Sequence, residues 1–388
     1  MLEAARPAGC GQVSAGPMAG IGRIGWCAGR PLPKLRALLL PKRMQKNNPL
    51  RGWQVDRSAI RHVGHGLQRP ECVLAERDGT LWAADARGGV MRIGADGGQQ
   101  LIVPAGPEDR GAQPGFAERY VLSQGSLPNG LAFLPNGDFV LANWGTDSVE
   151  VMDRQGRVRR LLDRIDGQPL GKANFVLRDR RGRIWLTVTT RMQPWTDSIN
   201  ARATDGYIAL IDEQGVRIVA DGFEGTNEVR LDAAEEWLYV VESNARRISR
   251  LRVGEDGSLS GREVYGPARL PGFPDGFAFD AFGNLWVTLI MSDRLVAITP
   301  EGELLTLLDD GNPQATEALD AHYEARTLTP EIMAAACGTL APWMASLSFG
   351  GADLRTVYLG SLRGSTLPSF RSPVAGLPPV HWNERTSP

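Results

Sequence analysis

Six oxygen-bearing side chains recur at one position of a repeated sequence unit. Each follows a turn and precedes two or three apolar residues, and in the five clearest units a second turn comes eight positions later. These units begin Glu71-Cys-Val-Leu, Asn129-Gly-Leu-Ala-Phe, Asn174-Phe-Val-Leu, Asn227-Glu-Val-Arg-Leu and Asp275-Gly-Phe-Ala-Phe, and a fainter sixth begins at Ser346. Carboxylate and amide oxygens are hard ligands, which suit Ca²⁺ or a similar divalent cation rather than a metal that prefers thiolates. An ion held by such a set can polarise a carbonyl or phosphoryl oxygen and acidify a water molecule.

A simpler interpretation is that these residues only form turns, because Asn-Gly, Pro-Asn and Asp-Gly are common turn sequences. Asn136-Gly137 and Asp166-Gly167 are ordinary turns of this kind. Five oxygen-bearing side chains at the same position of five repeated units are harder to explain in this way, and Glu71 is a poor turn former. If they converge, the two carboxylates repel each other and need a cation between them.

The elements that would bring these residues together are the blades of a β-propeller. The units recur every ~45 to 70 residues, and two more short alternating strands follow each one, such as Ser148–Met152 with Val158–Leu162. Repeats of this length with four strands each are typical of propeller blades. We therefore expect an all-β, six-bladed propeller in which the six polar residues lie at one level of the central channel. A strand around Ser58–Val63 is expected to complete the last blade and close the ring.

Two units are longer than their strands require. One insertion covers about residues 189–205, and a second covers about residues 309–342 before the last blade. The second is expected to be helical at its end, with Thr329 as N-cap, Pro330 at the first helical position and Gly338 as C-cap. Insertions of this length either cover a pocket or simply decorate the surface.

Composition excludes several classes of protein. Apolar residues make up 42% of the chain and charged residues 22%, which is ordinary for a globular protein. The net charge of −1 offers no general attraction for nucleic acid or an anionic membrane. No apolar run approaches the roughly 18 residues that span a bilayer. The four cysteines show neither a CxxC pair nor a zinc spacing, so we expect a cytoplasmic protein. We also expect a monomer or small homo-oligomer.

Residues 1–43 differ from the rest of the chain. They contain seven basic residues and one acidic residue, are rich in Gly, Ala and Pro, and show no sustained apolar period. This composition predicts a disordered extension. Our hypothesis is that translation starts at Met44, so that residues 44–388 form the propeller; the alternative is a targeting presequence.

The repeated phrases carry a family resemblance. Three segments resemble sequence motifs of the SMP-30/gluconolactonase family: Leu127-Pro-Asn-Gly-Leu-Ala-Phe133, Phe273-Pro-Asp-Gly-Phe-Ala-Phe279 and Phe349-Gly-Gly-Ala-Asp-Leu-Arg-Thr-Val-Tyr358. The resemblance extends over roughly residues 70–365. That family comprises six-bladed propellers that include regucalcin and bacterial sugar lactonases. One departure is Cys72-Val73, which stands where the family usually has Gly-Pro.

The resemblance implies a divalent metal held by Glu71, Asn227 and Asp275. It implies that Asn174 completes the set of ligands or contacts the substrate, and that Asp275 is also the general base for an attacking water. Asn129 falls where some members place a further polar residue, so a substrate contact is expected there. The sequence does not choose among Ca²⁺, Mn²⁺, Mg²⁺ and Zn²⁺, although the oxygen ligands favour Ca²⁺.

The expected reaction is metal-assisted opening of a sugar lactone, with a small-molecule lactone as the partner. Arg191 and Trp195, on the first insertion, are candidates to bind sugar hydroxyls and cover a ring face; the alternative is that they are simple loop residues. Two other functions stay open: a related propeller hydrolase acting on phosphotriesters, and a non-catalytic propeller that binds Ca²⁺ or a protein. No GxSxG motif is present, so a serine hydrolase of that type is not indicated.

Overall fold

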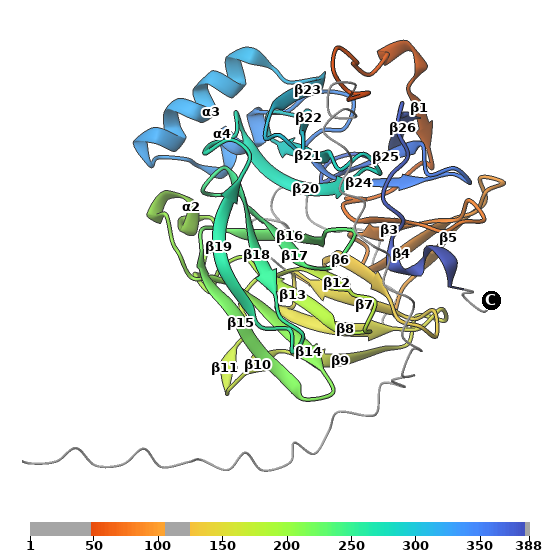
Figure 1. Ribbon diagram of the computed structural model, residues 1–388, viewed down its shortest axis with the longest axis vertical. Coiled ribbons are helices and arrows are strands. Elements are labelled where there is room, and N and C mark those ends of the chain that lie inside the picture. The colour runs from red at the N-terminus through yellow and green to blue at the C-terminus, as the bar shows by residue number, and fades with distance from the viewer. Residues whose placement is uncertain (1–47, 105–124, 385–388) are drawn as a thin grey trace, which may run out of the picture.

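The computed structural model describes residues 48–104 and 125–384, and the predicted extension at residues 1–43 lies outside them. Six four-stranded antiparallel sheets form a ring, which confirms the six-bladed propeller (Figure 1). The first blade contains β2 Val73–Ala75, β3 Leu81–Asp85, β4 Gly89–Ile93 and β5 Gln99–Ile102. The second contains β6 Pro128–Phe133, β7 Phe139–Asn143, β8 Ser148–Met152 and β9 Val158–Leu162. The third contains β12 Ala173–Arg178, β13 Ile184–Val188, β14 Gly206–Asp212 and β15 Gly215–Phe223. The next two are β16 Thr226–Leu231, β17 Trp237–Glu242, β18 Arg247–Val253 and β19 Leu259–Tyr265; and β20 Phe273–Phe279, β21 Leu285–Ile290, β22 Arg294–Ile298 and β23 Leu304–Asp309.

The sixth blade closes the ring with strands from both ends of the chain. It contains β24 Met344–Gly350, β25 Thr356–Ser361 and β26 Leu367–Arg371, and its outer strand is β1 Arg61–Val63. Val63 pairs with Leu367 in this antiparallel ladder. The strand predicted near Ser58–Val63 is therefore present, although Ser58 itself lies in the 3-10 turn η2 Arg57–Ala59.

The innermost strands share a second feature, a break in register at the recurring polar residue. In β6, β12, β16, β20 and β24 the pairing with the second strand of the blade shifts at this point; in β6 the shift falls between Pro128 and Leu131, and in β20 between Pro274 and Phe277. A bulge of this kind bends the strand and changes the direction of its side chains, and such bulges are common beside functional sites.

The two insertions form helices on one side of the ring (Figure 1). The first contains α2 Asp197–Ala201, and the second contains α3 Pro313–Ala325 and α4 Pro330–Ala335. The predicted start of α4 is confirmed, because the Thr329 side chain accepts a hydrogen bond from the Ile332 amide. The predicted C-cap at Gly338 is wrong: the cap is Ala336, because the Gly338 amide donates to Asp293 at 2.6 Å and the chain leaves the helix earlier.

The helices pack over the start of the innermost strands. They contribute to one buried apolar cluster with residues that directly precede or begin those strands: Leu127, Phe273, Trp343, Trp195, Ile199, Leu319, Tyr323, Leu328 and Met333. The two insertions are also joined directly, since the Asn200 side chain exchanges two hydrogen bonds, of 2.9 and 3.0 Å, with the backbone of Leu328. We call this unit the cap.

The opposite end of the channel is crossed by residues 376–384, which we call the C-terminal segment. Its contacts reach five blades: Leu377 N to Phe279 O and Gly376 N to Leu354 O, both 2.8 Å; His381 Nε2 near Ala75 O at 2.9 Å; the His381 ring edge-on to Phe133; and an Arg178–Glu384 ion pair. It ends in the 3-10 turn η3 Val380–Asn383.

A small hairpin, β10 Arg164–Ile165 with β11 Gln168–Pro169, contains the predicted Asp166-Gly167 turn. Within the described ranges, no helix is long and apolar enough to cross a membrane.

Candidate functional site

The structure brings the recurring polar residues together around the channel. Glu71 lies two residues before the start of β2. The other five lie on the innermost strands of successive blades: Asn129 on β6, Asn174 on β12, Asn227 on β16, Asp275 on β20 and Ser346 on β24. All six are buried, and the carboxylate residues Glu71 and Asp275 are only 5% and 4% exposed. We call this set the oxygen ring.

One half of the oxygen ring is held by Asn129. Its Nδ2 donates to Glu71 Oε1 at 2.7 Å and to the Asn174 carbonyl at 3.0 Å, and its Oδ1 accepts a hydrogen bond from Arg69. These bonds use both hydrogens of the amide, so in this structure Asn129 positions Glu71. The substrate contact predicted for Asn129 stays a prediction. Ser346 joins the same half, because its hydroxyl donates to the Glu71 carbonyl.

The other half is held by Asn227. Its Nδ2 donates to Asp275 Oδ1 and to the Ser243 hydroxyl, the latter at 3.1 Å. Ser243 in turn donates to the Pro274 carbonyl at 2.6 Å. With both amide hydrogens used in this way, the Asn227 carbonyl oxygen is left for another partner.

Three buried oxygens of the ring accept no hydrogen bond: Glu71 Oε2, Asn174 Oδ1 and Asn227 Oδ1, which come from three different blades. Glu71 Oε2 has an ion pair with Arg69, so the two amide oxygens are the ones left without a partner. A buried acceptor without a partner costs free energy, and such groups in a native protein commonly mark a missing ion or water. In the part of the chain that the structure describes, no group of three or more His, Cys, Asp and Glu side chains could hold a metal. The donor set that fits a divalent cation is instead this mixture of carboxylate and amide oxygens.

A buried arginine, which the sequence analysis missed, lies beside the ring. The Arg69 side chain is 1% exposed, and its Nη2 lies 3.2 Å from Glu71 Oε2; its Nη1 also donates to the Pro128 carbonyl at 3.0 Å. Alternation along the chain was not a usable signal for this residue, because Arg69 adopts a left-handed conformation with φ of 54°. Arg69 supplies the ring with a fixed positive charge.

A second pair of charged residues, which the sequence analysis also missed, lies on β16 next to the ring residue Asn227. The Glu228 carboxylate is 3% exposed and lies 2.6 Å from Arg230 Nη2. The Arg230 guanidinium lies 4.5 Å from the centre of the Phe175 ring. Glu228 follows the predicted ligand Asn227 directly, but strict alternation along a strand would have pointed it away from the channel.

Burial raises the pKa values of the three carboxyl groups in the channel. It raises the pKa of Glu71 to about 7, an effect that Arg69 opposes and Glu228 reinforces. It also raises the pKa of Glu228 to about 7 against the effect of Arg230. For Asp275, burial and then the negative charges of Glu71 and Glu228 raise the pKa well above its ordinary value. Without a cation the ring thus retains protons near neutral pH, whereas a bound cation would favour the ionised forms.

The two residues predicted on the first insertion lie in the cap region, with different surroundings. Trp195 is buried and packs edge-on against Trp144, with ring centres 5.2 Å apart. Arg191 is exposed, its guanidinium 4.2 Å from the centre of the Tyr207 ring. The predicted substrate contacts of both residues stay predictions.

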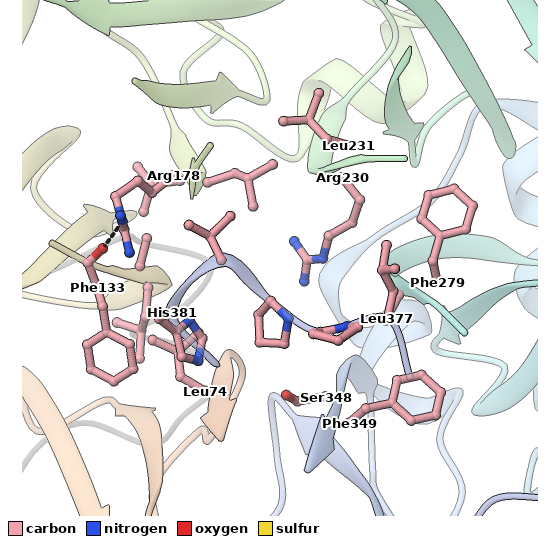
Figure 2. A pocket seen from close by; sticks show the side chains of 18 of the residues that line it. Leu74, Phe133, Arg178, Arg230, Leu231, Phe279, Ser348, Phe349, Leu377 and His381 are labelled. Carbon is pink, nitrogen blue, oxygen red and sulfur yellow. Dashed lines mark hydrogen bonds between the residues drawn. The ribbon is translucent and has the colours of Figure 1, made fainter. Parts of the chain in front are cut away.

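A cavity of about 160 Å³ occupies the other end of the channel. Its walls are innermost-strand residues that follow the oxygen ring in sequence, together with residues 377–381 of the C-terminal segment. Figure 2 shows the Arg230 side chain pointing into this space and the C-terminal segment crossing it. Its lining is mainly apolar, and the carboxylates Glu71 and Asp275 are not part of it, so the chemistry of the ring lies elsewhere.

Comparisons with known proteins agree with this architecture. The chain is 24% identical over 231 residues to 6-deoxy-6-sulfogluconolactonase of Pseudomonas putida, a match that covers 58% of this chain and just under two thirds (66%) of that protein. A gluconolactonase structure from Xanthomonas campestris has a TM-score of 0.58 at 17% identity, over 84% of this chain and 94% of that one. The structure of a calcium-binding protein, regucalcin, from Agrobacterium tumefaciens has a TM-score of 0.58 at 14% identity, over 86% and 98%. At these identities the two solved structures show the fold alone.

The family itself follows from a longer match. Residues 69–328 match the SMP-30/Gluconolactonase/LRE-like region. This range includes the first five residues of the oxygen ring, from Glu71 to Asp275, and the strands that position them. The chain belongs to the SMP-30/gluconolactonase/LRE-like family.

Proposed function

We propose that this protein is a divalent-metal-dependent lactonase that hydrolyses a sugar lactone to the open hydroxy acid. The observation that carries the proposal is the pair of unpaired, buried amide oxygens of Asn174 and Asn227 in one ring with the buried carboxylates of Glu71 and Asp275. The names of related proteins, which include a sulfogluconolactonase and a pentonolactonase, support lactones as the substrate class.

Glu71, Asn174, Asn227 and Asp275 would hold the cation. When bound, it would polarise the lactone carbonyl and stabilise the negative charge that develops on its oxygen. Hard oxygen donors favour Ca²⁺, with Mn²⁺, Mg²⁺ or Zn²⁺ as alternatives. The calcium-binding description of a structural neighbour supports the same choice.

Asp275 is the residue we assign to proton transfer. Asn227 donates to Asp275 Oδ1, which fixes the carboxylate and leaves Oδ2 to accept a proton from the attacking water. The water oxygen bonds to the lactone carbonyl carbon, the bond from that carbon to the ring oxygen breaks, and the ring oxygen takes up the proton. Lactone and water thereby give one hydroxy acid.

The test begins with protein freed of metal and then supplied with Ca²⁺, Mn²⁺, Mg²⁺ or Zn²⁺. Acid release from five- and six-membered sugar lactones is followed with a pH indicator. We expect metal-dependent turnover that falls about 10²- to 10⁴-fold in Asp275→Asn, the range for loss of a general base. Asp256→Asn, which changes an exposed carboxylate in the β18–β19 turn, is the matched control and is expected to keep full activity.

Other outcomes would select other functions. Hydrolysis of paraoxon but of no lactone would indicate a phosphotriesterase on the same ring. Metal binding without turnover on either substrate would indicate a non-catalytic binding propeller. Failure to bind any of the four cations would show that the ring is not a metal site.

A further inference from the structure

The residues that directly follow the oxygen ring residues form a second pattern around the channel. In blade order they are Cys72, Gly130, Phe175, Glu228, Gly276 and Leu347. The same order of residue types occurs in blades one to three and again in blades four to six: a side chain that can accept a hydrogen bond, then a glycine, then a large apolar residue. Cys72 and Glu228 therefore occupy equivalent positions on opposite sides of the six-bladed ring.

The two glycines are required by close approach of the next blade. A Cβ atom on Gly130 would lie 2.6 Å from the Cα of Phe175, and one on Gly276 would lie 2.6 Å from the Cα of Ser346. The Gly276 position has a further constraint, since its Cβ would lie 2.8 Å from Glu228 Oε1. The Glu228 carboxylate thus fills space that the missing side chain of Gly276 leaves open.

Cys72 and Glu228 make equivalent contacts with the following blade. The register shift in each innermost strand leaves a backbone amide outside the regular ladder. Leu131 N, two residues after Asn129, donates to Cys72 Sγ at 3.3 Å. Phe277 N, two residues after Asp275, donates to Glu228 Oε2 at 3.4 Å. Each acceptor therefore stabilises the bulge that directs the next ring residue into the channel.

A comparison of the two positions separates the structural role of Glu228 from any further one. The neutral sulfur of Cys72 is sufficient to accept an amide hydrogen bond at a bulge of this propeller. A carboxylate in the same place costs far more to bury, and it requires Arg230 at 2.6 Å as a partner. The Glu228 carboxylate also lies beside the ring, because a Cβ atom on Gly276, the residue after Asp275, would be 2.8 Å from Glu228 Oε1. Packing alone does not account for a charge placed here.

We propose that Glu228 is a positioning residue for the metal-binding ring: it fixes the bulge that orients Asp275, and its charge strengthens the attraction of the ring for a divalent cation. The inference rests on the proposed function. Residues that orient metal ligands in this way affect metal affinity or activity by about 10- to 100-fold when they are replaced. Glu228 itself is not assigned as a ligand.

The test measures cation affinity by isothermal titration calorimetry at pH 8 on metal-free protein, separately from turnover. Glu228→Gln keeps the size and an acceptor oxygen but removes the charge, and we expect its affinity for Ca²⁺, or for the best-binding cation, to fall about 10- to 100-fold. Glu228→Cys copies the arrangement at Cys72 and is expected to fold but to bind the cation equally weakly. The double variant Glu228→Gln/Arg230→Met controls for the arginine that Glu228→Gln leaves unpaired. Glu235→Gln, in the turn after β16, is the matched control and is expected to bind as the unmodified protein does.

The outcomes separate this inference from the proposed function. If the unmodified protein binds the cation but hydrolyses no lactone, the proposed function fails, while the affinities of the variants still test the role of Glu228. If Glu228→Gln and Glu228→Cys bind the cation within twofold of the unmodified protein, Glu228 only supports the bulge and the inference is overturned. A changed melting temperature with unchanged affinity would overturn it in the same way, and absence of cation binding by every form would overturn both proposals.

Discussion

The oxygen ring combines two opposed demands on its carboxylates. Glu71 and Asp275 are buried, which disfavours their ionised forms, and yet a divalent cation requires them to be ionised. Arg69 partly offsets this cost, because its guanidinium lies 3.2 Å from Glu71 Oε2 without occupying the unpaired amide oxygens of Asn174 and Asn227. The metal-free ring is therefore expected to be the least stable part of the channel at neutral and alkaline pH.

This conflict predicts how stability depends on pH. The pKa values of Glu71 and Glu228 are about 7 in the folded protein, above their ordinary value of 4.5. Between these values the folded state holds protons that the unfolded state has released, so the stability of the metal-free protein falls as the pH rises from ~4.5 through ~7. We expect the melting temperature of metal-free protein to fall by several degrees across this range, and added cation to raise it more at pH 8 than at pH 5.

Differential scanning calorimetry of metal-free protein at several pH values checks this expectation. Glu71→Gln cannot ionise and is expected to flatten the profile, whereas Asp256→Asn, which changes an exposed carboxylate, leaves its shape unaltered. A melting temperature that rises steadily with pH over the same range would contradict the predicted direction.

At the scale of elements, the cap acts as one unit only if its two insertions remain joined. The Asn200 amide makes both hydrogen bonds to Leu328, so Asn200→Ala leaves two backbone groups without their partner. We expect a loss of about 1–2 kcal/mol, and backbone amides of α2 and α4 that exchange with solvent about 5- to 30-fold faster. Hydrogen exchange followed by mass spectrometry measures this, with Glu317→Ala on the exposed side of α3 as the control. Equal protection in both variants would show that the apolar contacts alone hold the cap together.

The strands of the blades and the start of α4 could be predicted from the sequence, whereas α3 could not. The repeated unit predicts the blades, the closing strand and the six ring residues, and Thr329-Pro330 predicts the start of α4, because each is a local pattern. The pattern does not predict α3, in which only Thr316, Leu319 and Tyr323 are buried. Its place depends on distant contacts, such as that between Tyr323 and the Arg246 guanidinium, 4.0 Å from the ring centre.

The charged residues of the channel were missed for a related reason. Glu228 faces the channel only because β16 shifts register between Thr226 and Val229, and a bulge cannot be recognised from simple alternation along a strand. Arg69 lies between β1 and β2, in a left-handed conformation with φ of 54°, where no periodic pattern applies. In both cases the side chain direction is decided by backbone geometry that the residue type does not reveal.

At the scale of the whole molecule, the C-terminal segment links the blades across one end of the channel. It contacts five blades, and its Trp382 is only 6% exposed in an apolar cluster with residues of the first, fifth and sixth blades. We expect Trp382→Ala to cost about 3–5 kcal/mol of unfolding free energy, measured by urea denaturation. Asn383→Ala, at an exposed neighbouring position, is expected to stay within about 0.5 kcal/mol of the unmodified protein. Similar midpoints for the two variants would mean that the segment only rests on the surface.

The pairing of β1 with β26 has a consequence for biosynthesis. Val63 cannot meet Leu367 until the ribosome has added every residue between them, which takes on the order of 15–60 s at typical elongation rates. Blades one to five are each built from consecutive strands and can form while synthesis continues. The nascent chain therefore carries an unpaired β1 and an open ring throughout this interval, and a chain that stalls before residue 367 would present sheet edges to chaperones and to other nascent chains.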